Sequence, residues 1–213
     1  DKGAFVVFVQ NAFPGQTVEA QVVKCKSRHA ECRLLRVVKH AAFEIDLPYQ
    51  PIPGAPYAKI PMALQHQWKE STALDLYRRI GQVDNLEAVY RGLVASPLDW
   101  HYRNKMEYSF SAIRHDLETD EKVDDFGLGF KHRGTWWAVE NLDADSGLFD
   151  AEVESQLHEV RAWCEATGCP AWHPPRRQGF FRFFVVRKSH ADGGLLANLV
   201  TTSDHELDRE DFV

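Results

Sequence analysis

The chain has 213 residues, of which 44% are hydrophobic and 26% charged, and this ordinary globular composition excludes gross disorder and predicts one or two packed domains. No segment approaches the roughly 20 apolar residues of a transmembrane helix, and residues 1–6 lack the pattern of a signal peptide. We therefore expect a soluble, cytoplasmic protein. The four cysteines are scattered, which favours reduced thiols over a disulfide scaffold.

The formal net charge of −6 is unevenly distributed. Residues 1–46 hold seven Lys or Arg and five Asp or Glu, residues 47–100 hold five of each, and residues 101–213 hold thirteen against twenty-one. The cations are clustered, whereas many acids lie in segments that we expect to be loops. A local basic patch could therefore still bind a polyanion, although the whole chain is acidic.

Residues 1–46 are predicted to form a small β-rich domain. Strand patterns cover residues 5–9, 18–22 and 30–38, with a turn signal at Pro14 and Gly15. Three short strands cannot bury much surface alone, and a small barrel of the OB type needs about five. We therefore predict an incomplete OB-like barrel, with at least one strand missing before the first residue.

Residues 47–85 are predicted to form a proline-rich linker and a helix. Five prolines between residues 48 and 61 exclude both a helix and a regular strand ladder there. Leu64, Trp68, Leu76 and Ile80 then recur on one face, which predicts a helix over residues 62–80. Gly81 follows at the position where a left-handed C-terminal cap is expected.

Residues 86–213 are predicted to form a central α+β domain with a mostly antiparallel sheet, cut short at its C-terminus. The expected elements are strands at 103–113, 126–130, 135–139, 179–187 and 195–201, and a helix at 150–167 that ends at Gly168. The second and third strands should form a hairpin that turns at residues 132–134. The order βββαββ predicts a sheet with the helix packed on one side. Residues 204–213 resemble the start of a further helix.

Three motifs that might carry chemistry have simpler interpretations. Gly127, Gly129 and Gly134 lie between expected strands with no helix after them, which favours hairpin glycines over a phosphate-binding loop. Cys25, His29 and Cys32 lack the fourth ligand that a structural zinc site needs. Cys164 lies on the apolar helix face, and neither it nor Cys169 has an evident base, so nucleophilic roles are not expected.

Cations mixed with aromatic residues are the more informative pattern. Arg103 and Lys105 should share one face of a strand. The segment 174–184 mixes Arg176, Arg177 and Arg182 with Phe180, Phe181, Phe183 and Phe184, and strict alternation would place Phe181 and Phe183 opposite Arg182. Arginine neutralises phosphate and an exposed ring can stack a splayed base, so we predict that both segments contact RNA. Lys24, Lys26 and Arg28 add a charged loop on the expected barrel, where such folds often bind oligonucleotides.

An ordered set of short motifs resembles the RNA (uracil-5-)methyltransferase family, whose members form 5-methyluridine. Residues 3–9 and 12–18 are similar to the TRAM domain, an OB-like RNA-binding module. Residues 96–110, 127–131 and 184–187 are similar, in order, to segments of the central domain of these enzymes. The resemblance covers nearly the whole chain and implies that its partner is RNA, either ribosomal or transfer, with no membrane and no obligate protein partner.

The resemblance implies a third, catalytic domain in which a cysteine thiolate attacks the uracil ring and S-adenosylmethionine supplies the methyl group. None of the four cysteines matches that nucleophile, so we expect no catalytic residue and no cofactor-binding residue in this chain, and no activity from it alone. Many members also hold a [4Fe–4S] cluster on four cysteines. The corresponding stretch, residues 48–66, has no cysteine, and we predict neither a cluster nor another metal.

Two alternatives remain open from the sequence. The chain could be a free-standing RNA-binding accessory protein without an enzymatic half. It could instead be a protein-interaction module built on an OB-type barrel, in which case exposed apolar patches would dominate over basic ones.

Overall fold

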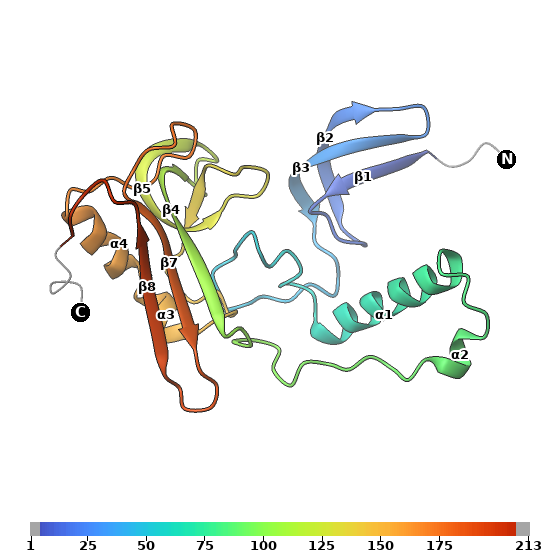
Figure 1. The fold of residues 1–213 in the computed structure, drawn as a ribbon. Coiled ribbons are helices and arrows are strands. Elements are labelled where there is room, and N and C mark those ends of the chain that lie inside the picture. The colour runs from blue at the N-terminus through green and yellow to red at the C-terminus, as the bar shows by residue number, and fades with distance from the viewer. Residues whose placement is uncertain (1–4, 208–213) are drawn as a thin grey trace. The chain divides into compact units, whose positions relative to one another are not determined.

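The computed structural model describes residues 5–207, which fall into two compact units (Figure 1). The first unit runs to Leu47 and continues with Pro56–Val94, and the second comprises Pro48–Ala55 and the chain from Ala95 onwards. The predicted division at 46 and 85 therefore differs from the observed one. The segment Pro48–Ala55 joins the second unit because the Gln50 amide there accepts hydrogen bonds from the backbone N–H groups of Asp143 (2.9 Å) and Ala144 (3.0 Å). Over residues 5–207, no helix is long and apolar enough to span a bilayer.

The first unit contains a three-stranded sheet of β1 (Val6–Gln10), β2 (Thr17–Cys25) and β3 (His29–Lys39), in the order β1-β3-β2. Strand β1 runs parallel to β3, and β2 runs antiparallel to it. The three predicted strands are confirmed. They do not close into a barrel within residues 5–207, so the OB-like barrel stays a prediction.

The helices of the first unit are α1 (Met62–Arg79) and the short α2 (Leu86–Val89). The predicted helix over residues 62–80 is confirmed, although none of its side chains is fully buried. Trp68 packs edge-on against Phe43, with ring centroids 5.4 Å apart. The predicted left-handed cap at Gly81 is wrong: the backbone stays helical long enough for the Gly81 N–H to reach the Leu76 carbonyl, and Gln82 takes the positive φ of 49°.

The second unit is built on a five-stranded sheet in the order β5-β6-β4-β7-β8. Its strands are β4 (Lys105–His115), β5 (Lys122–Lys131), β6 (Val139–Asn141), β7 (Phe181–Lys188) and β8 (Leu195–Thr201). The helices α3 (Ala151–Ser155) and α4 (Leu157–Ala166) lie between β6 and β7 in the chain. The predicted βββαββ order and α+β class are confirmed, and all the strand pairings are antiparallel except one bridge between β4 and β6.

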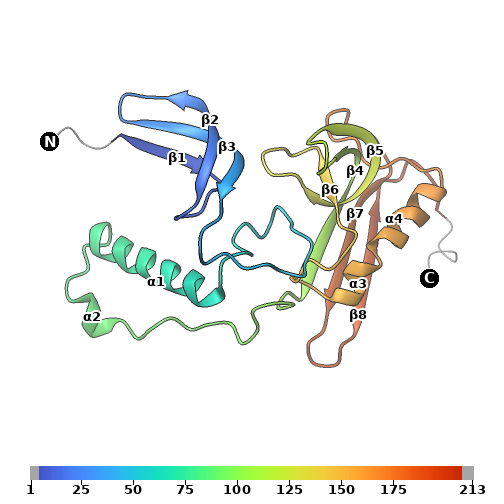
Figure 2. The same cartoon turned by 180° about the vertical axis from the view of Figure 1, so that it is seen from behind.

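The core of this unit lies between the sheet and the two helices, which cover one face of the sheet (Figure 2). Alternate residues of β4, namely Met106, Tyr108 and Phe110, point into this core together with Leu157 and Cys164 from α4. The predicted apolar helix face is therefore confirmed. The intervening residues of β4 face away from the helices, so the helices do not cover the opposite face of the sheet.

The second and third strands form the predicted hairpin, but the third strand is shorter and later than predicted. It covers only Val139–Asn141, so Trp136 and Trp137 lie in the connecting loop and not in a strand. Gly134 provides the turn with a φ of +84°. Gly129, in contrast, lies inside β5, where a Cβ atom would collide with the Glu140 carbonyl of β6. That glycine allows two backbones to approach closely and is not a turn residue.

A β-bulge interrupts β7 at Arg182. Phe181 pairs with Thr201 of β8 and Phe183 pairs with Val200, so β7 uses one residue more than its partner between these two pairs. A bulge shifts the alternation of side chains by one position. The prediction that Phe181 and Phe183 share a face is therefore wrong: Phe181 is fully buried in the core, whereas Arg182 and Phe183 both line a pocket outside it.

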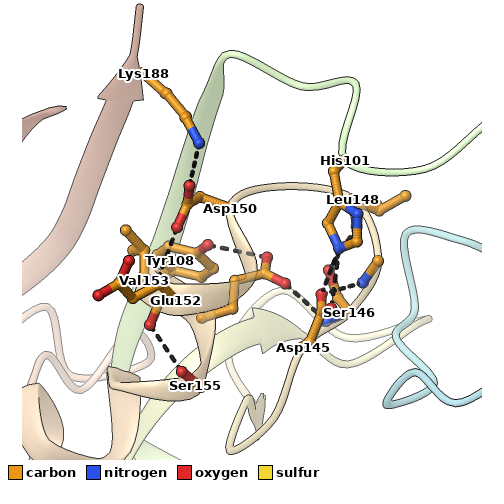
Figure 3. Close-up of polar contacts among 12 residues, drawn as sticks. His101, Tyr108, Asp145, Ser146, Leu148, Asp150, Glu152, Val153, Ser155 and Lys188 are labelled. Carbon is orange, nitrogen blue, oxygen red and sulfur yellow. Dashed lines mark hydrogen bonds and ion pairs between the residues drawn. The ribbon is translucent and has the colours of Figure 1, made fainter. Parts of the chain in front are cut away.

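Polar contacts hold α3 in place, and Figure 3 labels Tyr108, Ser146, Asp150 and Lys188 among the residues that make them. Glu154 of α3 is 0% exposed and accepts hydrogen bonds from the Tyr108 hydroxyl (3.0 Å) and the Ser146 backbone N–H (2.7 Å). Asp150 caps α3 by accepting a hydrogen bond from the Val153 N–H, and its carboxylate also pairs with Lys188 of β7. These contacts connect α3 to the neighbouring strands β4 and β7.

Candidate nucleic-acid interface

A cavity of about 300 Å³ opens on the second unit, and we call it the Trp–Arg pocket. Strands β4 and β7, the ends of β5 and β6 with the loop between them, and the segment before β7 supply its twelve lining residues: Ser109, Phe110, Ser111, Lys131, Trp136, Trp137, Val139, Trp172, Pro174, Arg177, Arg182 and Phe183. Ser109 and Phe183 are register partners on neighbouring strands, and both alternate with residues that point into the core. The floor of the pocket is thus the sheet surface that the helices leave uncovered.

Arg182 is placed in this pocket by the bulge and by an aromatic contact. Its guanidinium carbon lies 3.8 Å from the centroid of the Trp172 ring and 5.5 Å from that of Phe183. Among residues 5–207, Arg182 forms no ion pair, and its buried Nε atom has no hydrogen-bond partner. A buried N–H without a partner costs about 1–3 kcal/mol, a cost that the stacking on Trp172 has to offset.

Two more tryptophans come from the loop between β5 and β6. Trp136 is 62% exposed although it lines the pocket, so its ring is accessible to a ligand. Trp137 is half-buried, with the Lys122 ammonium 5.2 Å from its ring centroid. Large exposed indoles are rare in unliganded protein surfaces and are a common stacking platform for nucleic-acid bases.

The charge of the pocket contrasts with that of the region around it. Its lining includes the cations Lys131, Arg177 and Arg182 and not a single aspartate or glutamate. The surrounding chain from residue 101 onwards carries a clear excess of acids. A local positive site within an acidic surface concentrates an anionic ligand at that one point.

The structure brings together some of the predicted RNA-contacting residues and excludes others. Arg177 and Arg182 line the pocket, and Arg176 is exposed next to it, with its N–H 3.2 Å from the His173 Nδ1. Phe180, however, is 2% exposed and packs against Phe181 in the core. Its predicted role in stacking a base is wrong for this structure, because the ring cannot reach a ligand without opening the fold.

Arg103 and Lys105, the other cations of the second unit that were predicted to contact RNA, do not line this pocket. Lys105 pairs in register with Arg187, five residues from Arg182 along β7, which is roughly 17 Å at about 3.4 Å per residue. The Lys105 ammonium is held by Glu107 at 3.1 Å, and Arg103 is exposed before the strand begins. The cations share one side of the sheet but form two separate groups.

The third predicted group lies in the first unit. Lys24, Lys26 and Arg28 are all exposed around the turn between β2 and β3. The turn is fixed by a hydrogen bond from the Lys26 N–H to the His29 carbonyl at 2.8 Å. Their contact with RNA stays a prediction.

Lys131, Trp136 and Trp172 line the pocket but were not among the predicted site residues. The adjacent pair of tryptophans after Gly134 was a usable signal, because two indoles directly after a turn glycine cannot both be buried in a short strand. No sequence pattern marked Trp172 as a site residue. Its contact with the Arg182 guanidinium depends on the β-bulge, which turns Arg182 towards it.

The cysteines occupy structural or surface positions. Cys32 is buried on β3, Cys25 is exposed, and all four thiols are free. Burial raises the pKa of the Cys164 thiol to about 12, so its reactive thiolate is scarce at neutral pH. Over residues 5–207, no three His, Cys, Asp or Glu side chains are grouped so that they could hold a metal ion.

The described residues also do not fit S-adenosylmethionine. A nucleotide-type cofactor is typically held where a glycine-rich turn opens into a helix. Here Gly127 and Gly129 lie within a strand and Gly134 lies in a hairpin. No chemical step through that cofactor can be derived from this chain.

Comparison with known proteins identifies relatives of one kind, although no family model matches. The chain is 31% identical over 208 residues to a protein from Nitratidesulfovibrio vulgaris named as an uncharacterized RNA methyltransferase, covering 95% of this chain and 42% of that protein. A protein of the same name from Clostridium tetani is 24% identical, over 97% of this chain and 43% of the relative. The chain therefore spans less than half the length of the relatives it matches.

A solved structure supports the fold. The chain superposes on the crystal structure of a Pyrococcus abyssi tRNA (uracil-54, C5)-methyltransferase in complex with S-adenosyl-L-homocysteine, with a TM-score of 0.66 at 19% identity. The match covers 97% of this chain and 44% of that one. At this identity the similarity establishes the fold, and both units take part in it.

Proposed function

We propose that this chain is the RNA-recognition part of an S-adenosylmethionine-dependent enzyme that forms 5-methyluridine in ribosomal or transfer RNA. The proposal is supported by relatives that are named as RNA methyltransferases and by the fold shared with a solved tRNA methyltransferase. The observation that carries the proposal is the Trp–Arg pocket, in which three cations and an exposed indole converge without any carboxylate. Phosphate and an unpaired base need these two kinds of partner.

In this proposal the residues of the chain bind and orient RNA, and they do not transfer the methyl group. Lys131, Arg177 and Arg182 neutralise phosphates, while Trp136 offers a ring to a base. Arg103 and Lys105 form a second, weaker contact at the other end of the same sheet. We assign the thiolate, the general base and S-adenosylmethionine itself to a further domain, as the family resemblance implies.

Titration of the 213-residue chain with a fluorescent RNA hairpin tests the binding half of the proposal. We expect affinity to fall as salt rises, with a slope that reflects the number of phosphates neutralised. The double variant Arg177→Glu/Arg182→Glu should weaken binding more than Arg103→Glu/Lys105→Glu, since the pocket cations have no carboxylate beside them whereas Lys105 has Glu107. Affinity that does not change across the salt series would contradict the proposal.

Nucleoside mass spectrometry tests the enzymatic half. Separate ribosomal and transfer RNA pools from a strain lacking the gene should lose 5-methyluridine in one pool, and that pool identifies the substrate. The 213-residue chain incubated with the same RNA and S-adenosylmethionine should transfer no methyl group. If 5-methyluridine persists unchanged in both pools, the accessory RNA-binding alternative is the better account.

A further inference from the structure

We propose that the Trp–Arg pocket holds a single unpaired nucleotide of the RNA, which the lining residues of this chain bind and do not modify. The inference rests on the proposed function, because it assumes that the ligand is RNA. It goes further by assigning a defined nucleotide site to this unit.

The aromatic lining of the pocket points to a base as one part of the ligand. One side of the Trp172 ring is already covered by the Arg182 guanidinium at 3.8 Å. Trp136 has no such cover and is 62% exposed, so its ring is the free platform. Stacking on an indole accepts any base, because every base has a π-face.

The size and depth of the pocket require that base to be unpaired. A cavity of about 300 Å³ is at the lower end of the range for small-molecule sites, which suits one nucleotide and not a stretch of helix. A paired base in an RNA duplex presents only its edges and cannot stack on a protein side chain. A nucleotide in a loop or bulge can turn outwards into the pocket.

The cations of the pocket point to the phosphate of the same nucleotide. Arg182 has no ion-pair partner among the described residues, and its Nε is a buried donor without an acceptor. Arg177 and Lys131 are exposed on the same lining. A phosphate oxygen would accept from the part of the Arg182 side chain that lines the pocket, and the guanidinium would remain stacked on Trp172.

The lining of the pocket cannot perform the methylation chemistry. It contains no cysteine, histidine, aspartate or glutamate, so it offers neither a thiolate nor a carboxylate or imidazole base. The serines at positions 109 and 111 have no activating base among the lining residues. These lining residues therefore hold the nucleotide and do not themselves modify it.

Fluorescence of 2-aminopurine placed in RNA tests the inference directly. We would compare the 213-residue chain on two hairpins of equal length and charge, one with 2-aminopurine in the loop and one with it in the stem. Quenching should occur with the loop probe alone. Trp136→Ala should weaken binding of the loop hairpin by about 5- to 150-fold, the range expected from loss of one base–aromatic stack, and Trp136→Phe should restore most of it.

Matched cation variants separate base binding from general charge. Arg187→Gln removes one cation from the same strand, outside the pocket, and should leave the quenching intact, whereas Arg182→Gln should reduce it. Arg182→Lys keeps the charge but not the planar stack on Trp172, so it should recover the salt dependence and only part of the quenching.

The possible outcomes distinguish this inference from the proposed function. RNA binding that is salt-sensitive but unaffected by Trp136→Ala would overturn the nucleotide site and leave the proposed function standing. Equal quenching of loop and stem probes, or equal loss with Arg187→Gln and Arg182→Gln, would also overturn it. Failure of the chain to bind any RNA would contradict the proposed function itself.

Discussion

Replacing Glu154 by glutamine should change how the stability of the second unit depends on pH. Burial raises the pKa of the Glu154 carboxyl above its ordinary value, and the nearby Asp145 raises it further. The neutral amide can still accept from the Ser146 N–H and donate to the Tyr108 oxygen, so both contacts survive. The variant therefore removes the titration with little change in packing.

The sign of the effect follows from the raised pKa. Between the unfolded pKa near 4.5 and the higher folded pKa, the folded state binds more protons than the unfolded state, so the wild-type protein loses stability as pH rises through that window. One such group changes the free energy of unfolding by up to about 1.4 kcal/mol per pH unit. Glu154→Gln should match the wild-type protein below pH 4.5 and become increasingly more stable above it.

Urea denaturation followed by tryptophan fluorescence measures this difference, because every tryptophan except Trp68 lies in the second unit. Curves from about pH 4.5 to about pH 7.5 give the free energy of unfolding of both proteins under each condition. All other titrating groups are shared, so they cancel in the difference. A difference that stays constant across this range would refute the raised pKa of Glu154, and a more stable wild-type protein at neutral pH would refute the sign.

Three further predictions concern the same unit. Leu157→Ala should lower the free energy of unfolding by about 2–5 kcal/mol in urea denaturation, whereas Leu196→Ala, at a side chain 57% exposed, should change it by less than about 0.5 kcal/mol. Asp150→Ala should cost about 1–2 kcal/mol by the same assay because it removes the cap of α3 and a lysine partner, and Asp150→Asn should cost less. In the native protein a thiol reagent should label Cys25 rapidly and Cys164 only after unfolding; fast labelling of Cys164 would contradict its burial.

Much of the fold followed from local patterns. The helix over residues 62–80 and the strand over residues 195–201 were predictable because periodicity and flanking breakers agreed over a long window. The third strand of the second unit was predicted too early, since Thr135–Val139 has a strand-like composition although its tryptophans remain in a loop. Propensity alone could not show that β5 would pair mainly with β4 and leave only three residues for β6.

The site was only partly accessible from the sequence. Arg177 and Arg182 were predicted from their mixture with aromatic residues, and the structure places both in one pocket. Phe180 was wrongly predicted to stack on a base, because four phenylalanines within residues 180–184 give no indication of which rings belong to the core. The separation of Lys105 from Arg182 could not be predicted, because it depends on the register of β4 against β7. That register joins segments some 75 residues apart and does not follow from local composition.

The β-bulge at Arg182 constrains the length of β7 in related chains. The β-bulge shifts the alternation of side chains between the two faces of the sheet. Residues of β7 before the bulge can therefore be substituted independently of those after it. Substitution at this position should be tolerated by the core, but deletion of one residue would draw Phe181 out of the interior or turn Phe183 into it. Related chains should therefore keep the same length here.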